Sequence, residues 1–231
     1  MSKTITFLLL ILCLSLGFFS RQLEDFLVGF SFISWTSAYL FPKVLLTLSL
    51  LILPISLISL FGKKIGPIVY LLVAFSSISA FFIYSPIYEG DLNKVGSSDI
   101  FVTDTNTVLN NILKEKADFE GVFCIVSPTC SYCFAAAPIF KKLKSRKPNL
   151  DFALVVFTKD SSEVSFYQEN ANSYEFKHYQ TQNLEDASQL NLGGFPCYFY
   201  LKEGEIKQRW QAEELGYRAL DWIENGVGSI K

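Results

Sequence analysis

The first 88 residues alternate between long apolar runs and short charged breaks. Uncharged runs occupy residues 4–20, 26–42, 44–61 and 65–88, and the charges before Glu89 are confined to Lys3, Arg21, Glu24, Asp25, Lys43, Lys63 and Lys64. As a helix, each of the first two runs reaches about 26 Å, close to the lower limit for a hydrocarbon core of about 30 Å. The pattern therefore predicts four transmembrane helices, or three if residues 26–40 lie in the membrane interface.

The charges around these runs predict their orientation. The Lys63–Lys64 pair precedes the longest run, and basic loops favour the cytoplasmic side of a membrane. With that pair inside, the chain after Tyr88 lies outside in both arrangements. The sequence thus predicts an integral protein of the cell inner membrane with an extracytoplasmic, periplasmic C-terminal part. A signal peptide is the alternative for the first run, although no small-residue cleavage site follows it.

Beyond Tyr88 the pattern changes to that of a mixed α/β domain. Residues 89–107 are polar and rich in turn formers, which is typical of a linker, and residues 108–116 have a helical pattern. Further along, strands are predicted at residues 150–158 and 174–179, and helices at 161–169, 185–190 and 212–225. The predicted organisation is a transmembrane anchor at 1–88, a linker at 89–107 and a domain at 108–231.

A Cys-x-x-Cys pair stands where an apolar strand-like run meets the start of a helical pattern. The backbone N–H groups and the helix dipole at such a start stabilise an anionic sulfur, so Cys130 is the expected nucleophile. Cys133, three residues later on the same helix face, can close a disulfide with it or resolve a mixed one. Structural zinc normally needs four ligands, and the chain has no second Cys-x-x-Cys and only one histidine, His178.

Two prolines add to this pattern. Pro138 interrupts the helical pattern after the pair and is expected to bend that helix, and Pro196 precedes an apolar run and the hairpin sequence Lys-Glu-Gly-Glu-Ile. Together with the strand, cysteine pair and helix, these features resemble the thioredoxin superfamily over about residues 101–227. The resemblance implies a thioredoxin-like domain with a central mixed sheet and a cis Pro196 beside the dithiol. It also implies substrate-binding or supporting roles for Thr129, Ser131, Tyr132, Pro138, Phe195 and Pro196.

The strand and helix added before the proline loop identify a branch of that superfamily. They resemble the insertion of the membrane-anchored, extracytoplasmic TlpA-like reductases that are associated with cytochrome c maturation. The short helical unit that precedes the domain resembles the DoxX/MauE-type membrane proteins. These resemblances imply a membrane redox donor protein and the lipid bilayer as partners.

Two cysteines depart from the superfamily pattern. A buried carboxylate usually lies six residues before the first active cysteine, where this chain has Cys124, and a threonine often follows the cis-proline, where it has Cys197. On neighbouring strands, as the family's sheet order implies, they would crowd four thiols at one end of the domain. They could modulate the pair, or Cys197 could hold Cu(I) together with Cys130 and Cys133. Burial statistics favour simple packing for both.

The combined prediction is a protein disulfide oxidoreductase. Cys130 and Cys133 are expected to exchange disulfides with protein thiols and disulfides, more as a reductase than as an oxidant, without a cofactor or a metal ion. The net charge of −2 speaks against nucleic acid as a partner. A thiolate copper carrier and a redox-inactive binding module with the same fold are the alternatives.

Overall fold

The computed structural model describes residues 3–61, 71, 75, 78–79, 119–181, 184–191, 194–203 and 205–225. The chain divides into two compact units, Met1–Tyr88 and Glu89–Lys231, here called the first and second units. The predicted linker at 89–107, the predicted helix at 108–116 and most of the apolar run at 65–88 lie outside the described residues.

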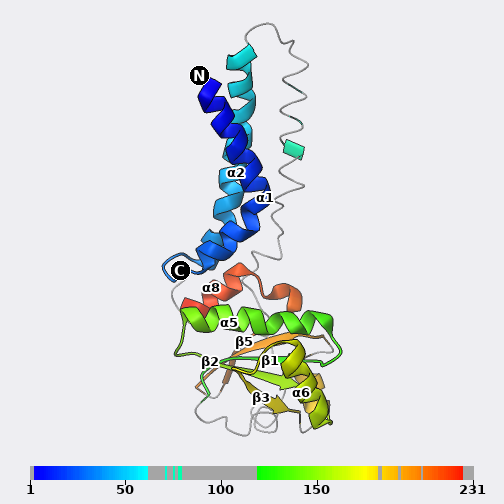
Figure 1. Ribbon diagram of the computed structural model, residues 1–231. Coiled ribbons are helices and arrows are strands. Elements are labelled where there is room, and N and C mark those ends of the chain that lie inside the picture. Colours follow the sequence, from blue (N-terminus) through cyan, green and yellow to red (C-terminus); the bar gives the residue numbers. More distant parts are fainter. Residues whose placement is uncertain are drawn as a thin grey trace. The chain divides into compact units, whose positions relative to one another are not determined.

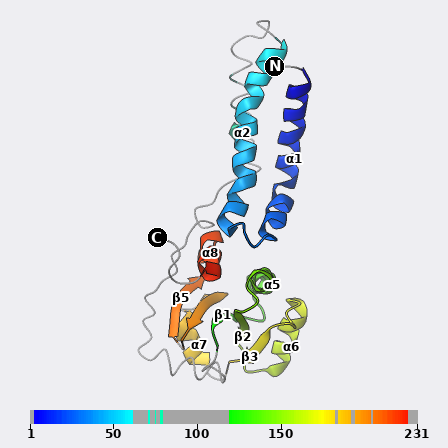
Figure 2. The same cartoon turned by 90° about the vertical axis from the view of Figure 1, so that its left-hand side faces the viewer.

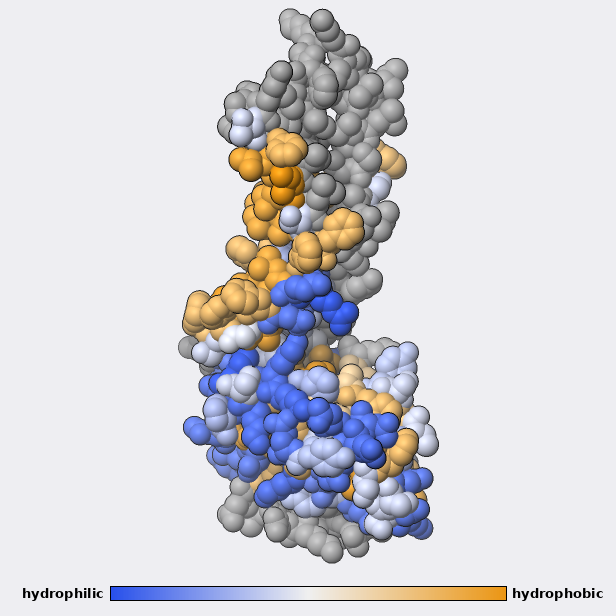
Figure 3. Space-filling view, in the orientation of Figure 1, coloured by the Kyte–Doolittle hydropathy of each residue, from blue (hydrophilic) through white to orange (hydrophobic). Residues whose placement is uncertain are grey.

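The described part of the first unit is a helical hairpin (Figures 1 and 2). Its helices α1 (Lys3–Val28) and α2 (Trp35–Phe61) pack against each other around buried side chains that include Leu16, Trp35 and Leu46. Large apolar side chains also lie on the hairpin surface, whereas the face of the second unit that is visible in Figure 3 is largely hydrophilic. The two units therefore bury their apolar residues to different extents.

The break between the two helices falls at a turn and not at a charged residue. The apolar run at 26–42 was expected to form one helix, but α1 ends at Val28 and α2 runs on through Lys43. Ser34 caps the start of α2, because its Oγ accepts a hydrogen bond from the Ser37 N–H at 3.0 Å. Lys43 is accommodated inside α2 with its Nζ 4.2 Å from the centre of the Tyr39 ring, one turn earlier.

The prediction of transmembrane helices is wrong for the described residues. Among them, no helix is both long enough and apolar enough to cross a membrane. Charged side chains lie within both helices of the hairpin, at Arg21, Glu24 and Asp25 in α1 and at Lys43 in α2. The predicted localisation in the inner membrane is contradicted by the same finding.

The second unit contains a five-stranded mixed sheet (Figures 1 and 2). In the order β3-β2-β1-β4-β5, the strands are β1 (Gly121–Val126), β2 (Asp151–Val156), β3 (Lys177–Gln180), β4 (Cys197–Lys202) and β5 (Glu205–Gln211). β2 is parallel to β1 and to β3, and β4 is antiparallel to β1 and to β5. The sheet is mixed, as the family resemblance implied, and β1 is its central strand.

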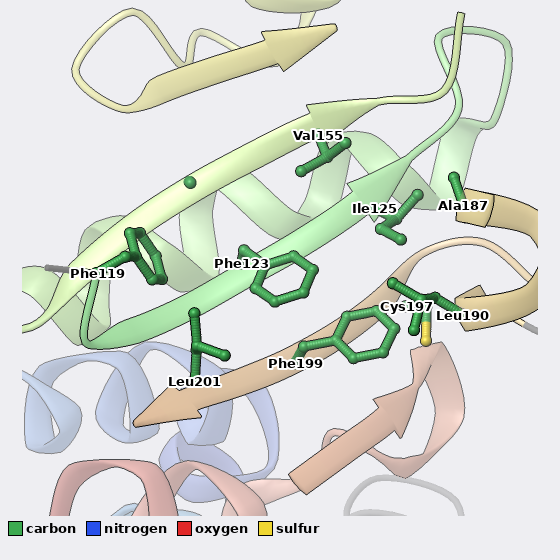
Figure 4. Packing of buried hydrophobic residues seen from close by; sticks show 10 residues of the cluster. Phe119, Phe123, Ile125, Val155, Ala187, Leu190, Cys197, Phe199 and Leu201 are labelled. Atoms are coloured by element: carbon green, nitrogen blue, oxygen red, sulfur yellow. The ribbon is translucent and has the colours of Figure 1, made fainter. Parts of the chain in front are cut away.

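Helices cover both faces of this sheet. On one face, Phe140 of α5 (Ala136–Arg146) contacts Tyr198, and Trp222 of α8 (Tyr217–Asn225) contacts Tyr200. The helix α6 (Ser161–Asn170) lies on this face as well, where its Tyr167 approaches His178 of β3. The helix α7 (Leu184–Asn191) covers the opposite face, and Figure 4 shows its contribution to the core there: Ala187 and Leu190 pack with Phe119, Phe123, Ile125, Val155, Cys197, Phe199 and Leu201.

Two predicted elements differ from those observed. The strand predicted from residue 174 begins only at Lys177, because residues 171–176 form turns in which Asn172 has a φ of 47°. The helix predicted at 212–225 is split into a short 3-10 turn, Ala212–Glu214, and α8. The side chain of Glu214 accepts the N–H of Gln211, which closes the 3-10 turn separately from the helix that follows.

Candidate functional site

Cys130 and Cys133 lie at the carboxyl end of the central strand β1. After the strand, the N–H of Cys130 donates to the carbonyl of Ser127 at 3.2 Å, and the N–H of Cys133 donates to the carbonyl of Cys130 at 3.0 Å. Cys130 is the N-cap of a 3-10 turn, Ser131–Ala135, which leads directly into α5. We call residues 130–135 the cysteine turn. The predicted unit of strand, cysteine pair and helix is therefore present.

Pro138 has a different role in the helix from the one expected. It was expected to bend a helix that started near Cys130, but α5 begins only at Ala136, which makes Pro138 its third residue. In the first turn of an α-helix the backbone N–H groups have no partner within the helix, so a proline is tolerated there without a bend. The change from a 3-10 turn to an α-helix comes before Pro138, between Ala135 and Ala136.

The two sulfurs have different environments. Cys130 is partly exposed, whereas Cys133 is fully buried. Burial raises the pKa of Cys133 to about 12, although the Ser127 N–H, 3.3 Å from the Cys133 Sγ, acts in the opposite direction. Near neutral pH the site thus combines one accessible sulfur with one buried, protonated thiol.

The loop before β4 completes the surroundings of Cys130. The Phe195–Pro196 peptide bond is cis, as predicted. The Cys130 thiol donates to the carbonyl oxygen of Phe195 over 3.9 Å, and the Phe195 ring packs on Phe157 with 5.1 Å between their centres. Beside Cys130 in the chain, Thr129, Ser131 and Tyr132 are exposed, Tyr132 to 77%. These residues surround an accessible sulfur with hydroxyl and aromatic groups.

The sheet separates the two cysteines that were expected to crowd the pair. Cys197 lies opposite Ile125 in the β1–β4 ladder and points into the core beneath α7 (Figure 4). Cys124, which precedes Ile125 in β1, therefore points to the other face, the face of α5 and α6. In the described part of the chain, no three His, Cys, Asp or Glu side chains come together as metal ligands. The set of Cys130, Cys133 and Cys197 proposed for Cu(I) is not assembled.

Cys124 lies on the face of the sheet that is covered by α5 and α6, near Cys133. Its thiol is fully buried and donates to the carbonyl of Ile125 over 3.8 Å. Burial raises its pKa well above the ordinary value, and the nearby Cys133 raises it further. A thiol with such a pKa stays protonated near neutral pH, so Cys124 does not supply the base that a carboxylate at this position would supply.

Tyr167 is a site residue that the sequence pattern did not identify. It lies on α6, is fully buried, and its Oη donates to the carbonyl oxygen of Cys133 over 2.6 Å. The amphipathic pattern predicted the helix, and a buried tyrosine requires a partner for its hydroxyl. That partner is 34 residues away in the sequence, so the pattern could not identify it.

His178 lies in β3, and the partners of its ring nitrogens are groups other than the cysteines. Its Nε2 shares a hydrogen bond with Ser173 Oγ at 2.9 Å, and its Nδ1 lies 2.9 Å from the carbonyl oxygen of Phe176. Both ring nitrogens therefore have partners. The geometry gives no support to a zinc site that joins this histidine to the cysteine pair.

Comparison with known proteins gives distant structural similarities. No protein-family model matches the sequence, and no curated protein matches it either. A secreted disulfide oxidoreductase of Mycobacterium tuberculosis, described as homologous to E. coli DsbE, is 16% identical over 44% of this chain and 80% of its own, with a TM-score of 0.36. A thiol:disulfide interchange protein from Bacteroides sp. is 18% identical over 51% of this chain and 80% of its own, with a TM-score of 0.40. These similarities are low, so the proposed function rests on the geometry of the cysteine pair.

The difference between the two sulfurs predicts their order of alkylation. With iodoacetamide near neutral pH, Cys130 should react first, because it is accessible whereas Cys133 is buried. Labelling of Cys133 should accelerate about tenfold for each pH unit as the pH rises, towards its pKa of about 12. Peptide mapping by mass spectrometry at graded pH measures both rates. Faster labelling of Cys133 than of Cys130 near neutral pH would reverse their assigned roles.

Proposed function

We propose that the second unit is a thioredoxin-like oxidoreductase that exchanges disulfides with protein substrates through Cys130 and Cys133. The observation that carries the proposal is the difference between the two cysteines. Cys130 is accessible, lies at a helix start and contacts the carbonyl of Phe195, whereas Cys133, one turn later, is buried. An exposed nucleophile and a shielded second thiol are the two groups that thiol–disulfide exchange requires.

The exchange runs in two steps. The Cys130 sulfur, as thiolate, attacks one sulfur of a substrate disulfide, breaks the substrate S–S bond and releases one substrate thiolate, which takes up a proton. Cys133 then gives up its proton and attacks the Cys130 sulfur of the mixed disulfide, which releases the second substrate sulfur as a thiol. The substrate gains two electrons and two protons, and the protein pair becomes a disulfide.

The groups around Cys130 contact the substrate. Thr129, Ser131 and Tyr132 are exposed beside the nucleophile, and Phe195 and Pro196 border it from the loop before β4. Hydroxyl, aromatic and backbone groups can all contact a polypeptide. Pro138 supports the site indirectly, since it lies in the first turn of α5, the helix that follows the cysteine turn.

We assign reduction as the working direction. A pair becomes strongly oxidising when its surroundings stabilise a thiolate in the reduced state. Cys133 makes no such contribution, because burial raises its pKa to about 12 and the thiol stays protonated near neutral pH. A second dithiol protein must then return electrons to the oxidised pair.

The assignment of the pair as a reductant predicts its reduction potential. After equilibration with glutathione buffers, the Cys130–Cys133 pair should have a reduction potential below about −240 mV. That limit lies within the range of the cytosolic glutathione couple. Trapping with acid and counting free thiols by mass gives the value. A potential near −120 mV, as in a strong oxidant, would assign the opposite direction.

Single substitutions should separate the two steps. Cys130→Ser should abolish exchange with a disulfide substrate, while Cys133→Ser should accumulate a mixed disulfide, because the second thiol is then missing. Insulin reduction and non-reducing gel electrophoresis measure the two outcomes. Cys197→Ser is the matched control, since it removes a buried sulfur from the opposite face of the sheet. Full exchange activity in Cys130→Ser would contradict the proposal.

Cys124 provides a test of how Cys133 loses its proton. Cys124→Asp places a carboxylate on the same face of the sheet as Cys133, and it should accelerate decay of the mixed disulfide by at least about tenfold. It should also lower the free energy of unfolding, because the carboxylate is buried. Stopped-flow exchange and urea unfolding measure these effects. An unchanged decay rate in a folded variant would mean that proton removal does not limit resolution.

A further inference from the structure

Tyr167 contacts the cysteine turn at two adjacent residues. Its Oη donates to the carbonyl oxygen of Cys133 at 2.6 Å, and its ring stacks on Phe134 with 5.5 Å between centres and 23° between planes. Tyr167 therefore contacts Cys133 through its hydroxyl and Phe134 through its ring.

The bond from Tyr167 bears on the local helix geometry. The Cys133 carbonyl also accepts the N–H of Ala136, a bond over three residues that closes the 3-10 turn. An α-helix would direct the same carbonyl to the N–H four residues on. A carbonyl oxygen has two lone pairs, so the Tyr167 hydroxyl can occupy one while Ala136 occupies the other. The Cys133 carbonyl thus accepts two hydrogen bonds, one from the backbone of the 3-10 turn and one from Tyr167.

The phenol is suited to a constant structural bond. Tyr167 is fully buried, and burial raises its pKa above the ordinary value, so its hydroxyl keeps its proton and remains a donor across the working pH range. Its helix is itself anchored, because Asp160 caps the start of α6 by accepting the Ser162 N–H at 2.9 Å. A capped helix thus presents a hydroxyl that keeps its proton to the cysteine turn.

We infer that Tyr167 is a positioning residue for the resolving step, an inference that rests on the proposed exchange function. By holding the Cys133 carbonyl and Phe134, it keeps the Cys133 sulfur directed towards Cys130 when the latter is bound to substrate. The effective concentration of the second thiol depends on that orientation. The first attack does not depend on it, because Cys130 precedes the held residues and is partly exposed.

The test compares the two steps in one experiment on the full chain. The reduced protein is mixed with dithiobis(nitrobenzoate): attack by Cys130 releases one coloured thiolate, and resolution by Cys133 releases a second. Tyr167→Phe removes only the hydroxyl, keeps the ring, and leaves the Cys133 carbonyl bonded to Ala136. We expect the second phase to slow about three- to tenfold, the usual value of one hydrogen bond, with the first phase unchanged.

Three further variants make the result decisive. Cys133→Ser should lack the second phase, which identifies that phase as resolution. Tyr174→Phe alters an exposed tyrosine just after α6 and should change neither phase. Phe134→Leu removes the ring contact but keeps the hydroxyl bond, and should slow the second phase less than Tyr167→Phe does.

The possible outcomes separate this inference from the proposed function. If the wild-type chain shows no second phase at any pH, the exchange function itself fails. If the wild type resolves normally and Tyr167→Phe leaves the second phase unchanged or faster, the positioning role is overturned. Equal slowing of both phases, or a greater effect of Phe134→Leu, would equally overturn it, because the hydroxyl would then not be the group that holds Cys133.

Discussion

The pairing of β1 with its two neighbours determines where the cysteine pair lies. β1 is hydrogen-bonded to β2 on one side and to β4 on the other, and all six of its residues are buried. The β2 pairing begins at Gly121, where a Cβ would lie 1.9 Å from the carbonyl oxygen of Asp151, so only glycine fits. The β4 pairing places the loop with Phe195 and Pro196 beside the end of β1. The positions of the two cysteine sulfurs and of the Phe195 carbonyl beside Cys130 therefore depend on these strand pairings.

The chemistry of the pair arises from a difference in burial over three residues. Cys130 precedes the 3-10 turn as its N-cap and is partly exposed, whereas Cys133 lies within that turn and is buried. Desolvation there disfavours the thiolate, and neither Cys124 nor Tyr167 can accept its proton near neutral pH, because burial raises the pKa of each. In the proposed exchange, resolution of the mixed disulfide is therefore the step that the burial of Cys133 affects most directly.

The period of two in a β-strand explains why the predicted cluster of four thiols does not form. Cys197 pairs with Ile125, so it shares that residue's face and joins the core under α7. Cys124 is one residue away from Ile125 and points to the opposite face. A shift of one residue in the β1–β4 register would have brought both sulfurs to one side. The register depends on the tertiary structure and cannot be deduced from the spacing of the cysteines.

Local pattern in the sequence determined most elements of the second unit and the location of its chemistry. The strand at residues 151–156, the helix at 161–170 and the cysteine pair at a helix start all follow from periodicity, capping and spacing within short windows. The same reasoning misplaced the helix break in the first unit and predicted membrane crossings that the described helices do not support. Composition alone did not reveal that Ser34 starts a helix or that Tyr39 accommodates Lys43.

Only the tertiary structure decided the contacts between distant segments. Tyr167 reaches Cys133 across 34 residues, and Arg146 forms a buried ion pair with Glu224 across 78 residues, with 2.8 Å between Nη2 and Oε2. Such partners depend on how helices pack over the sheet, which no local window contains. The sequence by itself determined which groups can react, because thiol chemistry belongs to the residue type. The fold decided which thiol is exposed, which is shielded and which face each occupies, because burial and strand register are properties of the packed chain.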